Sequence, residues 1–344
     1  MRILRKALFW VVVILIIGFM GLRADRKAVE KVIGVSQDKS FVMSAAPEAL
    51  LSGPVRMEIA DGCIYILDTE ESQVKVFNLR GEFVHAIGRR GKGPGEFNRP
   101  EGFFIERNKK LLGIADTGNR RIQVVNEEGL LVASGNLTYP PCGLSLMADK
   151  YYVASFPGSN VTLREDPLIN VYQSDFKLEK GFYKAIKTED LMLNMLINSI
   201  LIKADRAGNL VCGHQFGLNK IEIFDQKGKI IRSFEIIYKG ERPETPILKM
   251  RIRSDRDVQK IPYVLADLTF DAQNFYYFLS GEAGQGADGK KEKGREVYKY
   301  NDQGQYLGTI ILPCEARLMA IGDDGALYLV DDNYELKKFI LRGK

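Results

Sequence analysis

Residues 88–129 read GRRGKGPGEFNRPEGFFIERNKKLLGIADTGNRRIQVVNEEG. The stretch begins with a glycine-rich loop that ends at Arg99-Pro100, and three short apolar runs follow this loop. Polar turns separate the runs at residues 108–110, 116–119 and 127–129. Short apolar runs between Gly, Asn and Asp turns predict β-strands joined by tight hairpins. Four strands of this length are what one blade of a β-propeller requires.

Similar units recur along the chain. Residues 66–84 align with residues 114–132 without a gap, at an offset of 48. Further units with similar turns, in which polar residues precede the next strand, lie at residues 144–182, 209–231, 297–310 and 319–341. Six units of about 48 residues fall within the range of propeller repeats. We therefore predict an all-β fold, a six-bladed β-propeller over residues 55–344, in which stacked blades bury each other's apolar faces.

The sequence of residues 88–129 resembles the NHL repeat. The signature of that repeat is a G-x-G-x-G-x-F loop, a Pro, and a D-T-G-N-x-R-I-Q turn, which match residues 91–97, Pro100 and residues 116–123. In the preceding unit, Glu71 stands where the repeat has Asn and Gln73 where it has Arg. The resemblance implies a binding scaffold and no particular reaction. It also implies that three motif residues hold the turn rather than a ligand: Asp116, Asn119 and Arg121.

A hydrophobic leader precedes the repeats. Cations flank the apolar run Ala7–Leu22 within residues 1–27. As a helix, this run would span about 24 Å, a little less than a hydrocarbon core of about 30 Å. We predict a retained N-terminal transmembrane anchor helix, with a cleaved signal peptide as the alternative. Both interpretations place the propeller in the periplasm or outside a bacterial cell. Residues 28–54 are expected to form a connector, in which Ser40–Ser44 provides a strand that closes the ring.

The net charge of +5 belongs to the leader. Residues 1–27 carry six basic residues and one acidic residue, which leaves 43 of each sign in the rest of the chain. Binding of nucleic acid depends largely on neutralising phosphates with Lys and Arg. A neutral body therefore predicts no nucleic-acid partner.

Four cysteines are distributed one to a unit: Cys63, Cys142, Cys212 and Cys314. An even number in an exported chain permits disulfides. Because these cysteines lie in different blades, we predict four free thiols that behave as small hydrophobic groups. The chain has no CxxC motif and only two histidines, His85 and His214, so a zinc site made of Cys and His clusters is not expected.

The long loops are predicted to share one face. Connections on one side of a propeller blade are uniformly tight in this chain, as at Asp61-Gly62 and Arg80-Gly81. The other side carries every long insertion, at residues 89–99, 157–167, 185–198, 239–262 and 281–295. Residues 188–202 are expected to form a short helix capped by Thr188 and then a strand. Loops on a rigid scaffold are where binding residues concentrate, so this loop-bearing face is the predicted working face.

Basic side chains are predicted on the loop-bearing face of a neutral domain: Arg89, Arg90, Lys92, Arg120, Arg251 and Arg253. We expect them to contact an acidic or polar partner, such as a carbohydrate, a peptide segment or another envelope protein. The glycine-rich loop lacks a G-K-[ST] ending and a following helix, which favours a blade connector over a phosphate-binding loop. The sequence thus predicts a non-catalytic, membrane-tethered binding scaffold without a cofactor.

A second interpretation is enzymatic. Carboxylate and amide side chains lie at or near the expected starts of innermost strands: Glu101, Asn198, Asp267 and Glu315. Oxygen ligands that converge on a propeller axis can hold Ca²⁺. The pattern resembles six-bladed lactonase-type propellers, which hydrolyse substrates with Glu, Asn and Asp as metal ligands. The sequence sets no ligand spacing, so acids that simply face a water-filled channel are the simpler interpretation.

Overall fold

The computed structural model of the chain describes residues 31–155, 167–239, 246–281, 283–285, 291–292 and 294–342. The chain divides into two units, residues 1–31 and 32–344, and the second unit contains all the described strands. The predicted anchor helix at residues 1–27 lies outside the described residues. Within the described residues, no helix is long and apolar enough to cross a membrane.

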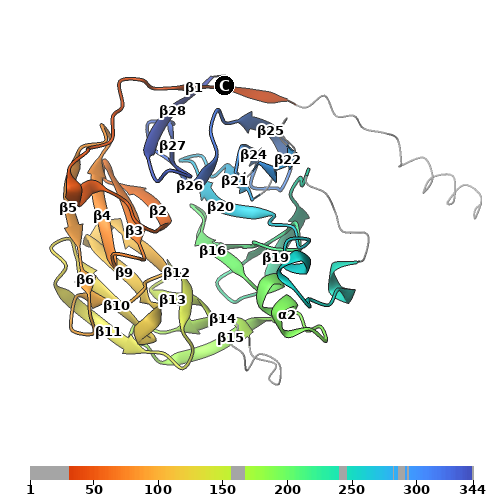
Figure 1. Cartoon of the computed structure of the whole chain (residues 1–344). Helices are drawn as coiled ribbons and strands as arrows, with labels where there is room; N and C mark the ends of the chain where they lie inside the picture. The colour runs from red at the N-terminus through yellow and green to blue at the C-terminus, as the bar shows by residue number, and fades with distance from the viewer. Residues whose placement is uncertain are drawn as a thin grey trace, which may run out of the picture. The chain divides into compact units, whose positions relative to one another are not determined.

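Six sheets surround a central axis as the blades of a β-propeller (Figure 1). Each blade is a four-stranded antiparallel sheet, and its first strand is the innermost in all six. Blade 1 contains β2 (Pro54–Ala60), β3 (Cys63–Asp68), β4 (Gln73–Asn78) and β5 (Phe83–Ile87). Blade 2 contains β8 (Gly102–Glu106), β9 (Leu111–Asp116), β10 (Arg121–Asn126) and β11 (Leu131–Asn136). Blade 3 contains β12 (Pro141–Met147), β13 (Lys150–Ser155), β14 (Pro167–Tyr172) and β15 (Leu178–Lys184).

The second half of the ring repeats this arrangement. Blade 4 contains β16 (Ile200–Ala204), β17 (Leu210–His214), β18 (Lys220–Phe224) and β19 (Ile230–Glu235). Blade 5 contains β20 (Leu265–Phe270), β21 (Tyr276–Ser280), β24 (Glu296–Tyr300) and β25 (Tyr306–Ile311). Blade 6 contains β26 (Ala316–Ile321), β27 (Leu327–Asp331) and β28 (Leu336–Arg342), completed by β1 (Val32–Gln37). The predicted all-β, six-bladed propeller is therefore confirmed.

Short elements occupy the connections. The loop between blades 1 and 2 contains the paired strands β6 (Arg89–Arg90) and β7 (Glu96–Phe97). A second small pair is β22 (Ala283–Gln285) with β23 (Lys291–Glu292). Among the described residues, the helices are α2 (Leu191–Ile197) and α3 (Asp255–Val258), and single 3-10 turns are η1 (Pro47–Ala49), η2 (Arg107–Lys109), η3 (Thr117–Asn119) and η5 (Ile247–Lys249).

A strand from the N-terminal side closes the ring. Residues 34–37 of β1 pair antiparallel with residues 339–342 of β28, and Val32 and Ile33 pair in parallel with β25 of blade 5. The prediction of a closing strand in Ser40–Ser44 is wrong in position, because those residues contain no strand. They cross from blade 6 to blade 1 instead. Phe41 packs edge-on against Tyr328, and the Ser44 amide donates to the Gly81 carbonyl at 2.8 Å.

The core lies between the blades, because each sheet is apolar on both faces. In β3, four consecutive side chains from Ile64 to Leu67 are buried, and successive side chains of a strand point to opposite faces. Ile64 and Ile66 pack toward blade 6, whereas Tyr65 and Leu67 pack toward blade 2. Stacking around the ring therefore supplies the burial that a single sheet lacks.

The D-T-G-N-x-R turn is a hydrogen-bonding hub. Asp116 is completely buried, and its carboxylate accepts bonds from the Asn98 amide (2.7 Å), Asn119 Nδ2 (2.9 Å) and Arg121 Nε (2.7 Å). Arg121 also donates to the carbonyls of Gly93 and Glu96, both at 2.9 Å. These bonds tie the glycine-rich loop to blade 2. The predicted structural role of Asp116, Asn119 and Arg121 is confirmed.

Helix α2 lies in the connection between blades 3 and 4. Its N-cap is Asp190, whose side chain accepts a bond from the Leu193 amide at 2.8 Å, so the predicted cap at Thr188 is wrong by two residues. Thr188 stands two residues further out, where its hydroxyl accepts from the Asp190 amide at 3.2 Å. The following strand, β16, is present as predicted.

All four cysteines are among the described residues, and all four are free thiols, as predicted. We expect alkylation under denaturing, non-reducing conditions to count four thiols, with or without prior reduction. In the native protein Cys212 should stay unlabelled, because it is 1% exposed and burial raises its pKa well above that of an ordinary thiol. Mass spectrometry of the labelled chain measures both counts. A denatured count of two or zero contradicts this arrangement.

Candidate binding site

The two faces of the propeller differ in the length of their connections. Turns between first and second strands, and between third and fourth strands, contain two to five residues. Apart from residues 38–53, which link β1 to β2, the connections longer than this join strand ends on the opposite face: residues 88–101, 156–166, 185–199, 236–264 and 281–295. The predicted loop-bearing face is thus confirmed, and the other face is called the tight-turn face.

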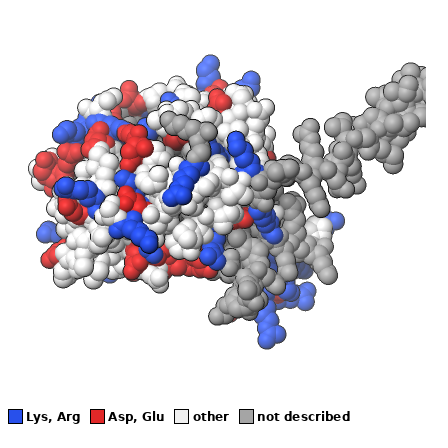
Figure 2. All heavy atoms as spheres, turned by 90° about the horizontal axis from the view of Figure 1, so that it is seen from above, with Lys and Arg blue, Asp and Glu red and all other residues white. Residues whose placement is uncertain are grey.

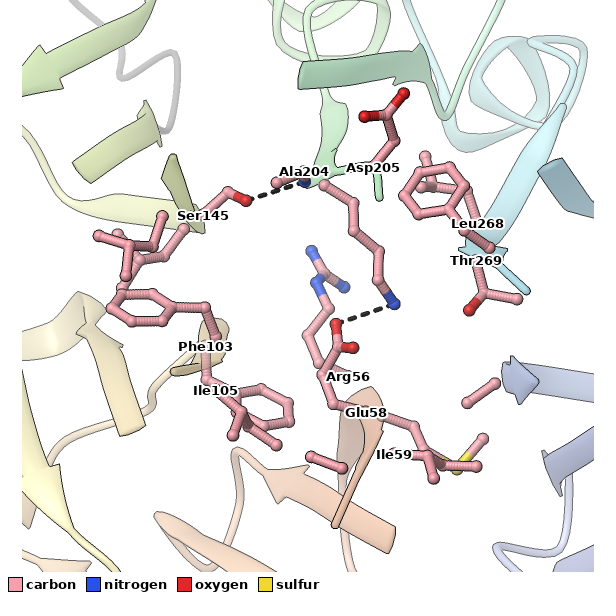
Figure 3. A pocket seen from close by; sticks show the side chains of 18 of the residues that line it. Arg56, Glu58, Ile59, Phe103, Ile105, Ser145, Ala204, Asp205, Leu268 and Thr269 are labelled. Carbon is pink, nitrogen blue, oxygen red and sulfur yellow. Dashed lines mark hydrogen bonds and ion pairs between the residues drawn. The ribbon is translucent and has the colours of Figure 1, made fainter. Parts of the chain in front are cut away.

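A cavity of about 410 Å³ runs along the propeller axis (Figure 3). The innermost strands of all six blades line it: β2, β8, β12, β16, β20 and β26. Because each of these strands starts on the loop-bearing face, Arg56, Gly102 and Asp267 lie toward that end. Glu106 and Arg206 lie toward the tight-turn end. We call this cavity the axial channel.

An ion pair spans the axial channel. Lys203 Nζ lies 2.8 Å from Glu58 Oε1, and the two side chains are 19% and 28% exposed. Glu58 belongs to blade 1 and Lys203 to blade 4, which are opposite in a six-membered ring, so the contact crosses the axis (Figure 3). The Ser145 hydroxyl of blade 3 accepts a bond from the Ala204 amide at 2.9 Å and fixes the strand that carries Lys203.

Arg56 points into the channel from β2 (Figure 3). Within the described part of the chain, its guanidinium donates only to two main-chain carbonyls, those of Val55 at 2.7 Å and Cys142 at 3.5 Å. A guanidinium has five N–H donors and cannot be deprotonated in proteins. Arg56 therefore keeps a positive charge and free donor capacity in a half-buried place.

Two carboxyl groups share the electrostatic environment of Arg56. Burial raises the pKa of Asp267 to about 6, while the charges of Lys203 and Arg56 act against this rise. The Asp267 carboxylate accepts bonds from the amides of Leu268 (2.9 Å) and Met319 (2.8 Å), and the second bond links blade 5 to blade 6. Burial also raises the pKa of Glu101, again opposed by Arg56. The loop-bearing end of the channel thus combines one arginine with one partly desolvated acid, Asp267, and the charge of Arg56 also reaches Glu101.

A second charged contact bridges the tight-turn end of the channel. Asp323 of blade 6 lies 3.2 Å from Arg107 of blade 2 and 3.6 Å from Arg206 of blade 4. These three blades alternate around the ring, so the contacts meet near the axis. Arg107 also donates to the Ile59 carbonyl at 2.6 Å. The contact of Asp323 with both arginines therefore crosses the tight-turn end of the channel.

The structure brings only some of the predicted basic residues together. Arg89, Arg90 and Lys92 lie on the connection from blade 1 to blade 2, and Arg120 lies on the neighbouring turn of blade 2. The remaining two, Arg251 and Arg253, lie between blades 4 and 5, on the opposite side of the ring. Arg89 pairs with Glu96 at 2.8 Å and Arg251 pairs with Glu189. Positive and negative side chains are interspersed over the side shown in Figure 2.

Donors of the glycine-rich loop bind the carboxylate of Glu96, which belongs to the same loop. Glu96 accepts bonds from the amides of Gly93 (2.8 Å) and Lys92 (3.1 Å) and from Arg89 Nε (3.0 Å). These donors lower the pKa of Glu96, the Gly93 amide most strongly. The amides that a phosphate would need are therefore engaged, in agreement with the predicted connector role.

The four residues of the metal interpretation do not converge. Of Glu101, Asn198, Asp267 and Glu315, only Asp267 lines the axial channel. Asn198 is buried as a brace beside α2, where it accepts from the Ile186 amide and donates to the carbonyls of Ile186 and Asn194, each at 2.8 Å. Within the described residues, no three His, Cys, Asp or Glu side chains are grouped so that they could hold a metal ion.

Sequence reasoning missed the polar centre of the channel. Arg56, Glu58 and Lys203 lie within strands, whereas the predicted basic residues lie on the connections and the residues of the metal interpretation were sought at or near strand starts. The signal was present, because charged residues interrupt the apolar runs VRMEIA and ILIKA of two innermost strands. Charged side chains inside otherwise apolar inner strands are therefore the pattern that marks this channel.

Comparisons with known proteins agree with the architecture. Residues 44–207, slightly less than half of the chain, match the DUF5128 family, described as a 6-bladed beta-propeller. None of the curated proteins compared with the chain matches it.

Three solved structures illustrate the structural similarity. A Bacteroides vulgatus protein of the DUF4221 family has a TM-score of 0.66 at 12% identity, covering 92% of this chain and 100% of its own. A Bacteroides fragilis protein, named as a candidate exported protein, has a TM-score of 0.58 at 15% identity, covering 91% and 96%. A streptogramin B lyase has a TM-score of 0.52 at 11% identity, covering 90% and 98%. At such identities the likeness concerns the fold alone, and by that measure the chain is a six-bladed β-propeller.

Proposed function

We propose that the protein is an exported, membrane-tethered binding scaffold whose loop-bearing face holds a protein, peptide or carbohydrate partner without catalysing a reaction. The observation that carries the proposal is the uneven distribution of connections. Apart from the β1–β2 link at residues 38–53, every connection longer than five residues joins strand ends on the loop-bearing face. Insertions that served only as spacers would have no reason to avoid the other face, and binding residues concentrate on loops held by a rigid scaffold.

Export and tethering rest on the leader. Three cations, an apolar run of 16 residues and further cations are typical of a signal anchor. The resemblance of blade 2 to the NHL repeat supports the assignment of a binding scaffold, because propellers of that type have no single reaction in common. A neutral body gives no electrostatic reason for binding nucleic acid.

Ca²⁺-dependent hydrolysis at the channel has less support. Arg56 places positive charge beside Glu101 and Asp267, and this charge opposes the binding of a cation between them. The side-chain amide of Asn198 is already engaged in hydrogen bonds with the main chain of Ile186. The geometry of the described residues therefore favours the non-catalytic scaffold.

Replacing Arg89, Arg90 and Lys92 together by Ser should weaken partner binding and reduce its dependence on salt. Capture of partners from solubilised membranes, quantified at two salt concentrations, measures both effects. The free energy of unfolding should change by less than about 1 kcal/mol, because exposed ion pairs contribute little.

The matched control replaces three exposed cations of the tight-turn face: Arg80, Lys109 and Lys227. It should leave partner capture unchanged. Loss of partners in this control alone would assign the working surface to the tight-turn face and refute the proposal.

A further inference from the structure

The axial channel contains a cation without an ion-pair partner in the described chain. The charge of Lys203 is matched by Glu58 at 2.8 Å, and that of Arg107 by Asp323 at 3.2 Å. Arg56 donates only to main-chain carbonyls. Partly burying a charge is unfavourable unless hydrogen bonds and an opposite charge compensate it. An anionic ligand bound in this cavity of about 410 Å³ would supply the opposite charge that the guanidinium of Arg56 lacks.

We propose that the axial channel binds a small amphipathic monocarboxylate, with its carboxylate on Arg56 and its apolar part against the walls formed by blades 2 and 3. This site goes beyond the proposed scaffold function, and it does not require a macromolecular partner on the loop-bearing face. The volume falls within the range of about 300–1,000 Å³ found for small-molecule sites.

The chemistry of the lining selects a carboxylate over other charged groups. A guanidinium presents parallel N–H donors that match the two oxygens of a carboxylate. A cation would be repelled by Arg56 and Lys203. A phosphate dianion would meet the carboxylates of Glu58 and Asp267 in the lining, where Arg56 is the one cation of the described residues that no ion pair engages.

The walls of the channel explain why the ligand is amphipathic. Phe103 and Ile105 of blade 2 and Leu144 of blade 3 line the side away from the ion pair, and Figure 3 shows Phe103 and Ile105 there. Ser145 uses its hydroxyl as an acceptor for the Ala204 amide. This side therefore offers mainly apolar contact, which an aromatic or aliphatic group can fill.

The test compares acids with their uncharged amides. Benzoate and 3-phenylpropionate are titrated against the full-length protein in detergent, alongside benzamide, 3-phenylpropanamide and inorganic phosphate, with dissociation constants measured by ligand-observed NMR. At least one acid should bind about tenfold or more tightly than its amide, because a hydrogen bond to a charged group contributes more than one to a neutral group. Inorganic phosphate should bind more weakly than that acid.

Variants assign the binding to Arg56. Arg56→Met should weaken the acid about tenfold or more while leaving the amide unchanged, and Arg56→Lys should retain part of the affinity. Arg80→Met removes an arginine that is 79% exposed on the tight-turn face and should change nothing. If Arg56→Met fails to fold, the comparison of acids, amides and phosphate on the wild-type protein still tests whether the channel binds a monocarboxylate. Equal binding of acids and amides, tighter binding of phosphate, or no binding at millimolar concentrations overturns the proposal.

Discussion

A chain that begins at Lys39, and so lacks β1, is expected to lose about 5 kcal/mol or more of its free energy of unfolding. β1 pairs with β28 over four residues and with β25 over two, and Ile33 and Val35 pack against the cluster between blades 5 and 6. Since a whole domain is stable by only about 5–15 kcal/mol, this loss approaches the total. Urea unfolding followed by circular dichroism measures it.

The control is a chain that begins at Lys31, which keeps β1 and should unfold like the full-length protein. Val35→Pro in the full-length chain tests the same strand without truncation, because proline cannot donate a hydrogen bond within a sheet. Val35 is paired with Leu341 of β28. Equal urea midpoints for the chains beginning at Lys31 and Lys39 would show that the ring closes without β1.

Asp116→Ala should destabilise the propeller by about 3–5 kcal/mol, because it leaves a buried arginine without its counter-ion. Asp116 is fully buried, and Arg121, whose side chain is 15% exposed, lies 2.7 Å from it. The Asn98 amide also loses its acceptor, which should loosen the glycine-rich loop. The midpoint of urea unfolding and proteolysis within residues 88–99 are the measurements.

Two variants of blade 2 control this result. Asp116→Asn keeps one carbonyl oxygen and should lose less stability than Asp116→Ala. Glu128→Ala removes an exposed acid from a tight turn of the same blade and should change stability by less than about 0.5 kcal/mol. An equal effect of Asp116→Ala and Glu128→Ala would contradict the role of the hub.

The blades could be predicted from the sequence because the interactions that form their turns join residues close together in the chain. The D-T-G-N-x-R turn places an acid, an amide and an arginine within six residues, so their mutual bonds hardly depend on the rest of the chain. Strand length and turn residues recur with a period of about 48, which points to six equivalent units. The same periodicity showed which connections are long and therefore which face carries them.

Predictions were less accurate where two local candidates competed. Thr188 and Asp190 both suit an N-cap, and the choice depends on which side chain reaches the Leu193 amide. Residues 32–37 and 40–44 are both short and partly apolar. Which of them closes the ring depends on the edges of β25 and β28, about 270 residues away or more.

By itself, the sequence determined the repeat, the turn chemistry, the unequal faces and the separation of the four cysteines, since each depends on residues close in the chain or on their order around a ring. Only the tertiary structure decided the contents of the axial channel. Glu58 and Lys203 are 145 residues apart, and they meet because six blades place blade 1 opposite blade 4. Arg56 shares a channel with Asp267 for the same reason. Ring closure sets these distances, and no local pattern contains them.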